Sequence, residues 1–187
     1  MHTRWTFFCF HWIRYLEIKP ILHVAWKTGD FSNLGIEGAD DILAEFNEKA
    51  DPGEICNTLI LELCGEGEPL HIEAGLPELI HDLRKTRAGE YAAEHLGTLI
   101  AADPHVEEWW SVEDGLAGIL TPDQVREAYS GLAPMHRASL KPAARGLASI
   151  ARRFTPGDPA AGRLAEMIDL LKEAAEEELG IAVLREN

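Results

Sequence analysis

Short apolar segments in the first half of the chain, with polar residues between and around them, predict β-strands. Three such segments are TFFCFHWI (6–13), PILHVAW (20–26) and NTLILELC (57–64). In the last of these, Leu59, Leu61 and Leu63 fall on one face of a strand, which is typical of a sheet with one partly solvated side. A fourth strand is expected in EGEPLHIEAG (66–75), as a hairpin partner of the third.

Apolar residues three and four positions apart predict helices through most of the remaining chain. These helices are expected in GADDILAEFNEKADPGE (38–54), LPELIHDLRK (76–85), GEYAAEHLGTLIAA (89–102), TPDQVREAYSGL (121–132), KPAARGLASIARRF (141–154) and DPAAGRLAEMIDLLKEAAEEELG (158–180). Thr121 has the character of an N-cap, and residues 51–53, Gly131 and Gly180 are expected stops. The final segment, 181–186, could return to the sheet as a strand.

These elements together predict an α+β fold. We expect an N-terminal antiparallel or mixed sheet of three to five strands, covered by a helical C-terminal half. Residues 1–75 would be mostly strands with one helix, and residues 76–187 mostly helices. A chain of 187 residues with 46% hydrophobic residues can bury a substantial core, so residues 1–187 are expected to form a single domain.

Cysteine usage indicates a reducing compartment. Cys9, Cys56 and Cys64 are an odd number and contain no Cys-x-x-Cys pair, which argues against a disulfide framework and a zinc ribbon. No apolar run approaches the roughly 20 residues that a membrane span requires. We therefore expect a cytoplasmic protein with no membrane involvement.

The negative charge is concentrated in the middle of the chain. Residues 37–118 carry four Lys and Arg against twenty Asp and Glu, a net charge of −16, whereas residues 1–36 have a net charge of +2. Because such a field repels phosphates and attracts basic proteins, we expect a basic protein partner and no direct binding of nucleic acid. The overall net charge of −15 has the same implication.

Two adjacent tryptophans lie within the acidic segment VEEWWSVEDG (106–115). Tryptophan is enriched at binding hot spots, and carboxylates around it would select a basic partner. The candidate partner-binding residues are Glu107, Glu108, Trp109, Trp110, Glu113 and Asp114. The alternative is that both indoles fill the space between the sheet and the helical half, with the acids merely solvated.

Recognisable catalytic motifs are absent from the sequence. It contains no phosphate-binding glycine loop and no Gly-x-Ser-x-Gly nucleophile turn, so no catalytic residue and no cofactor are expected. An alternative hypothesis is a metal site of the His and carboxylate type, suggested by a Glu-x-x-His spacing on one helix. Its candidate ligands are His71, Glu73, Glu78, His81, Glu94 and His95.

The stretch SVEDGLAGILTPDQVREAYSGLAP (111–134), followed by LAEMIDLLKEAAEEELGIAVLRE (164–186), resembles the C-terminal half of the YfbM-like family of bacterial domains of unknown function. The shared pattern covers about residues 111–187 and consists of a helix beginning near a Thr-Pro turn, a long Ala- and Glu-rich helix and a terminal apolar strand. The resemblance implies an α+β fold and assigns no catalytic residue.

Three functional hypotheses follow from these patterns. The first is a non-enzymatic binding protein, for instance an immunity protein or inhibitor that neutralises a basic toxin or nuclease. The second is a hydrolase or metal-dependent enzyme that uses the His and carboxylate residues. The third is a structural or assembly subunit whose aromatic N-terminal strand pairs with another copy.

Overall fold

The computed structural model describes residues 4–47, 49–73, 76–85, 87, 89–100, 116–140 and 159–186. The elements from the first half of the chain are β1 (Arg4–Phe10), α1 (Trp12–Thr28), α2 (Ala39–Leu43), α3 (Pro52–Cys64), β2 (Gly65–Glu73), α4 (Leu76–Leu83) and α5 (Glu90–Ile100). They are followed by β3 (Leu116–Leu120), α6 (Pro122–Leu140), α8 (Pro159–Glu176) and β4 (Gly180–Glu186). This arrangement confirms the predicted α+β class.

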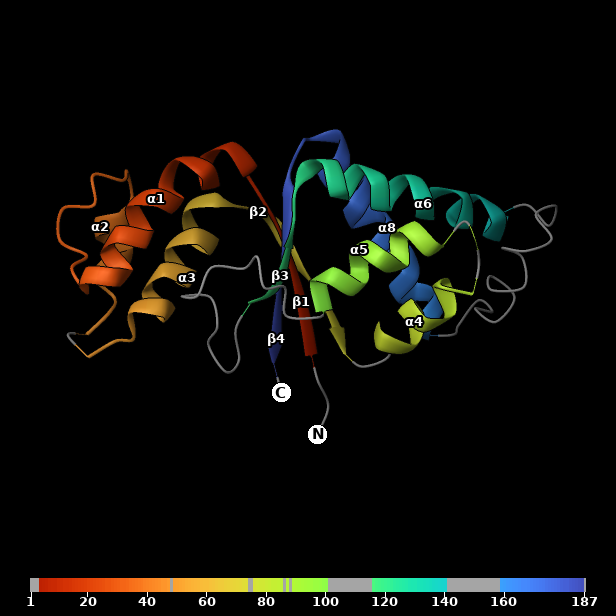
Figure 1. Cartoon of the computed structure of the whole chain (residues 1–187), viewed down its shortest axis with the longest axis horizontal. Coiled ribbons are helices and arrows are strands. Elements are labelled where there is room, and N and C mark those ends of the chain that lie inside the picture. Colours follow the sequence, from red (N-terminus) through yellow and green to blue (C-terminus); the bar gives the residue numbers. More distant parts are fainter. Residues whose placement is uncertain are drawn as a thin grey trace.

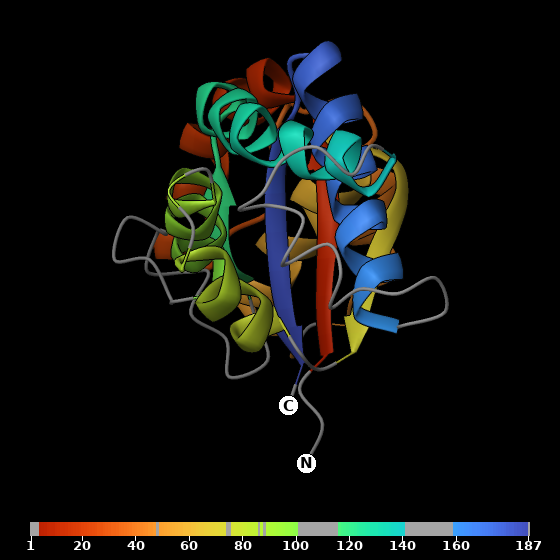
Figure 2. The ribbon, with the colours of Figure 1, turned by 90° about the vertical axis from the view of Figure 1, so that its right-hand side faces the viewer.

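The described strands form one antiparallel sheet in the order β2-β1-β4-β3. Helices cover it on both faces (Figures 1 and 2), with α1, α2 and α3 on one side and α4, α5, α6 and α8 on the other. The predicted cover by the C-terminal helices is therefore correct for one face only. The expectation that the sheet is mostly N-terminal is also only partly met, because β3 and β4 come from the later part of the chain.

Burial on both faces explains why β1 is almost continuously apolar. Successive side chains of a strand point to opposite faces. Trp5 and Phe7 pack in the core beneath α4, α5, α6 and α8, whereas Phe8 and Phe10 belong to the core beneath α1 and α3. The sheet thus separates two apolar cores. No helix in the described ranges is long and apolar enough to cross a membrane.

The predicted strand at residues 20–26 is wrong, because this segment continues α1. Pro20 lies inside the helix, where a proline normally disfavours helical structure. Tyr15, Ile18, Leu22 and Ala25 form its buried face at three- and four-residue spacing. Apolar residues also lie on its opposite face, and these hide the helical period from the sequence pattern.

The predicted strand at residues 57–64 is also wrong, because this segment lies in α3. The residues expected to mark a helix stop, 51–53, instead start this helix. The Asp51 carboxylate accepts hydrogen bonds from the backbone N–H groups of Gly53 (2.8 Å) and Glu54 (3.2 Å), and Pro52 occupies the first turn. Within α3, Cys56, Leu59 and Ile60 are buried at helical spacing.

The predicted fourth strand is present as β2, but its partner differs from the expected one. Because residues 57–64 form a helix, β2 pairs with β1 and not with a neighbouring hairpin strand. In turn, β1 is paired on both sides, by β2 and β4. Its backbone is therefore not available for the expected pairing with another copy of the chain.

The predicted N-cap of α6 is confirmed, whereas α8 ends at Glu176, before the predicted stop at Gly180. Thr121 and Gln124 form a reciprocal capping box: the Gln124 backbone N–H donates to Thr121 Oγ1 (3.3 Å), and the Thr121 N–H donates to Gln124 Oε1 (2.9 Å). Contrary to prediction, α6 continues past Gly131 to Leu140. The expected final strand is present as β4, and the predicted helix that would span residues 141–154 lies outside the described residues.

Candidate functional site

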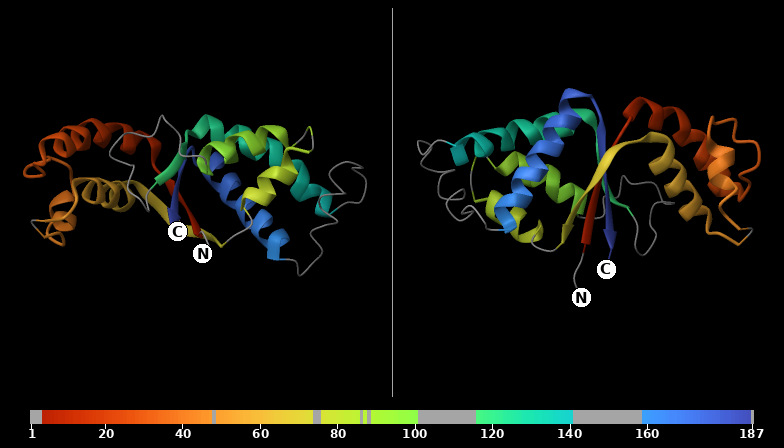
Figure 3. Two further views of the ribbon diagram at one scale, coloured as in Figure 1. Left: turned by 60° about the horizontal axis from the view of Figure 1, so that its bottom comes forward. Right: turned by 180° about the vertical axis from the view of Figure 1, so that it is seen from behind.

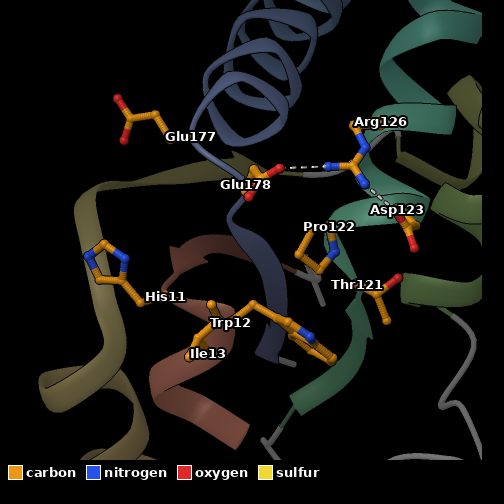
Figure 4. A pocket seen from close by; sticks show the side chains of 9 residues that line it. All are labelled: His11, Trp12, Ile13, Thr121, Pro122, Asp123, Arg126, Glu177 and Glu178. Carbon is orange, nitrogen blue, oxygen red and sulfur yellow. Dashed lines mark hydrogen bonds and ion pairs between the residues drawn. The ribbon is translucent and has the colours of Figure 1, made fainter.

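A pocket of about 510 Å³ opens at one end of the sheet (Figure 4). It is lined by His11, Trp12, Ile13, Thr121, Pro122, Asp123, Arg126, Glu177 and Glu178. These residues come from the β1–α1 junction, the start of α6 and the turn between α8 and β4. None of these residues belongs to the predicted sites.

Strand register brings these three parts of the chain together. The last residue of β1, Phe10, is opposite the first residue of β4, Gly180. The last residue of β3, Leu120, is opposite Ile181 of β4. The turns and helix ends that follow or precede these strands therefore gather at the same end of the sheet. Figure 3 shows the same segments of the chain from below and from behind.

The floor of the pocket is apolar and aromatic. The half-buried Trp12 ring packs on Phe10 and Tyr15, with centroid distances of 5.9 and 5.4 Å, and these contacts fix its orientation. From the start of α1 its side chain extends toward Pro122, at the start of α6 (Figure 4). The exposed side chain of Ile13 continues this apolar surface outward.

The wall of the pocket carries more negative than positive charge. Arg126 lies between two acids, Asp123, with which it forms a close ion pair, and Glu178, at 3.6 Å. Glu177, the third carboxylate, forms no ion pair within the described part of the chain, and its side chain points away from Arg126 (Figure 4). The pocket lining therefore holds three carboxylates and one guanidinium, which leaves a net attraction for cations.

His11 contributes a second polar pair at the pocket edge. Its Nε2 lies 2.7 Å from Glu66 Oε2, and both side chains are about half exposed. The backbone of His11 also connects the elements, because its N–H donates to the Cys64 carbonyl and its carbonyl accepts from the Tyr15 N–H. The pair adds a fourth carboxylate, Glu66, to this end of the sheet.

The three cysteines are buried and free. Burial raises the pKa of Cys9 and of Cys56 to about 12 and that of Cys64 to about 11. For Cys9, the carboxylates of Glu173 and Glu177 raise the pKa further. Because the thiolate is the reactive form, burial disfavours nucleophilic chemistry at these three positions at neutral pH.

The predicted partner-binding residues cannot be placed in this geometry. All six lie outside the described residues, namely Glu107, Glu108, Trp109, Trp110, Glu113 and Asp114. Their proposed role stays a prediction.

The candidate metal ligands that the structure describes are distributed over separate elements. His71 Nδ1 lies 3.0 Å from the Thr6 hydroxyl on β1, and His95 Nε2 lies 2.9 Å from Glu127 on α6. Glu78 and His81 are exposed on α4, Glu94 is exposed on α5, and Glu73 ends β2. Among the described residues, no group of three or more His, Cys, Asp or Glu side chains is placed to hold a metal ion.

No family model, no curated protein and no solved structure matches this chain. The resemblance of residues 111–187 to the YfbM-like family therefore stays a prediction. The pocket was missed in the sequence because its residues lie in three short stretches, 11–13, 121–126 and 177–178. Among its residues, the sequence analysis singled out only Thr121, as an N-cap.

Proposed function

We propose that this protein is a binding module that recognises a basic protein partner, and that the pocket receives a lysine or arginine side chain of that partner. An immunity protein or inhibitor directed against a basic toxin or nuclease has such a function. The observation that carries the proposal is an aromatic floor beneath a wall with three carboxylates and one guanidinium.

The two parts of the pocket suit the two parts of such a side chain. Lysine and arginine have an apolar stem that packs along hydrophobic surfaces, and Trp12 with Pro122 offers that surface. The cationic head would lie beside the indole of Trp12, since an aromatic face attracts a cation, and the carboxylates of the pocket lining would add to this attraction. The overall charge of −15 favours the approach of a basic protein.

A capture experiment tests this proposal. The wild type, a Glu177→Lys, Glu178→Lys variant and a matched Asp41→Lys, Glu45→Lys control are immobilised and exposed to lysate of the source organism at low and moderate salt. Both variants change the net charge equally, but the control acids are exposed on and beside α2, on the opposite side of the sheet from α6 and from the end of α8, which Glu177 and Glu178 follow. We expect a basic protein to be retained by the wild type and the control, and to bind the pocket variant at least about tenfold more weakly.

Elution distinguishes occupation of the pocket from general attraction. Arginine amide should release the partner at a lower ionic strength than sodium chloride does, because arginine amide also competes for the pocket itself. The proposal is wrong if the control variant loses the partner as completely as the pocket variant. It is also wrong if Trp12→Ala, folded by circular dichroism, leaves the affinity unchanged.

A further inference from the structure

Helix α1 has an apolar face that nothing in the described part of the chain covers. Ile13 is 73% exposed, Val24 61%, Leu16 48% and Ile21 38%. On a helix these residues and Pro20 form one stripe along the outer face. The stripe extends over twelve residues from Ile13 to Val24, about 16 Å for eleven rises of about 1.5 Å each.

The opposite face of α1 is already used to cover the sheet. Tyr15, Ile18, Leu22 and Ala25 are buried in the core beneath this helix. A helix that is apolar on both faces is normally covered on both faces. An exposed apolar stripe of this length, next to polar residues, is characteristic of an interaction site.

Basic residues follow one edge of this stripe. Lys19, His23 and Lys27 are four residues apart, so they form a row along the helix. The other edge carries Arg14 and Glu17, which form a 3.7 Å ion pair with each other. The helix as a whole has three basic residues and one acid, although the complete chain has a net charge of −15.

We propose that the outer face of α1 docks an amphipathic helix of a partner protein, with apolar residues on its contact face and acidic residues along the edge that meets Lys19 and Lys27. Amphipathic helices bind apolar surfaces through residues spaced three and four apart, which matches the spacing of Leu16, Pro20 and Val24. Charge complementarity decides the chemistry of the edge. At physiological salt the Debye length is about 8 Å, so a partner helix on the stripe is affected more by the charge of Lys27 than by the distant acids.

The same charges disfavour two other occupants. A second copy would bring the net positive charge of its own α1 against this one. An anionic bilayer is planar and would meet the acidic remainder of the molecule as well as the stripe. A helix of a partner touches only α1. This proposal goes beyond the function proposed for the pocket, because only Ile13, at the pocket edge, belongs to both surfaces.

Two synthetic peptides test the proposal on the full chain. Both have the same leucine face and helical length, but one has glutamates and the other lysines at the flanking positions. Fluorescence anisotropy at physiological salt should show tighter binding of the glutamate peptide to the wild type. Leu16→Gln with Val24→Gln should weaken that binding at least about tenfold, whereas Tyr91→Gln, at a residue 65% exposed on α5, should leave it unchanged.

A charge exchange makes the test specific for the basic edge. Lys27→Glu should weaken binding of the glutamate peptide by about three- to tenfold and should strengthen binding of the lysine peptide. Lys49→Glu should change neither affinity. Equal binding of the two peptides to the Glu177→Lys, Glu178→Lys variant, whose pocket no longer attracts lysine, overturns the proposal, and so does binding of neither peptide.

Three further outcomes would identify another occupant and would also overturn it. Self-association of the wild type that Leu16→Gln with Val24→Gln abolishes would indicate a second copy. Binding to anionic vesicles without binding to the glutamate peptide would indicate a lipid surface. A melting temperature lowered by several degrees in the Leu16→Gln, Val24→Gln variant would show that the chain itself covers the stripe.

Discussion

At the residue scale, the contact between Gly180 and Phe10 fixes the geometry of the pocket. Gly180 begins β4 directly opposite Phe10, and a Cβ atom at this position would lie 2.7 Å from Phe10 Cζ and 3.1 Å from Trp12 Cε3. Phe10 is almost completely buried and cannot move away. The absence of a side chain at residue 180 therefore allows the aromatic floor to pack against the sheet.

We expect Gly180→Ala to lower the free energy of unfolding by about 1–3 kcal/mol, because the new methyl group overpacks this contact. Urea unfolding measures the change. Gly97→Ala is the matched control, since the nearest atom there is the end of the flexible Arg84 side chain, at 3.0 Å, and the residue lies within a helix. A Phe10→Leu, Gly180→Ala double variant should lose less free energy of unfolding than the sum of the two single variants. A loss equal to that sum would show that the contact with Phe10 is not the cause.

At the element scale, α1 and α3 form a helical layer that the sequence pattern assigned to strands. Both are rich in β-branched or leucine residues, and α3 has the alternation Leu59, Leu61, Leu63 by coincidence. The start of α3 is determined by its cap, since Asp51 satisfies two N–H groups that have no partner within the helix. The segment Asp51-Pro52-Gly53 is equally typical of a helix end, so composition could not decide between the two.

Loss of this cap should destabilise the layer. Asp51→Ala is expected to lower the free energy of unfolding by about 1 kcal/mol, and Asp51→Ser by less, because serine can still accept a hydrogen bond from the same N–H groups. Thermal unfolding followed by circular dichroism would detect the difference. Equal losses for alanine and serine would show that the hydrogen bonds of the cap are not responsible.

At the scale of the whole molecule, two apolar cores share one sheet, and each contains at least one buried thiol. Cys9 lies in the core on one face, and Cys56 and Cys64 lie in the core on the other. Burial raises their pKa values to about 12, 12 and 11, respectively, from an ordinary value of 9.0. Above pH 9 the unfolded chain would lose these protons while the folded protein retains them.

Stability should therefore decrease as the pH rises from about 9 toward 11, by roughly 1 kcal/mol per pH unit for each thiol. Urea unfolding at pH 8, 9.5 and 10.5 measures this slope. Cys56→Ala should be less stable at pH 8, because it leaves a cavity, but should show a shallower pH dependence. An unchanged slope in this variant would contradict the assigned role of the thiol.

The sequence predicted those elements in which one period dominates. The helices α4, α5 and α8 and the strands β1, β2 and β4 follow from clear periodicity or from bounded apolar runs. The sheet order could not be predicted, because the pairing of β1 with both β2 and β4 depends on contacts between distant parts of the chain. The pocket depends on that order, so its residues could not be grouped from sequence.

The position of β4 between β1 and β3 also has a consequence for synthesis in the cell. Residues 4–10 can complete their pairing only after residues 180–186 have left the ribosome, since β4 is a neighbour of β1. After β2 has formed and until β4 emerges, the aromatic strand β1 has one open edge, and such edges recruit other strands. We therefore expect the nascent chain to be an early client of ribosome-associated chaperones.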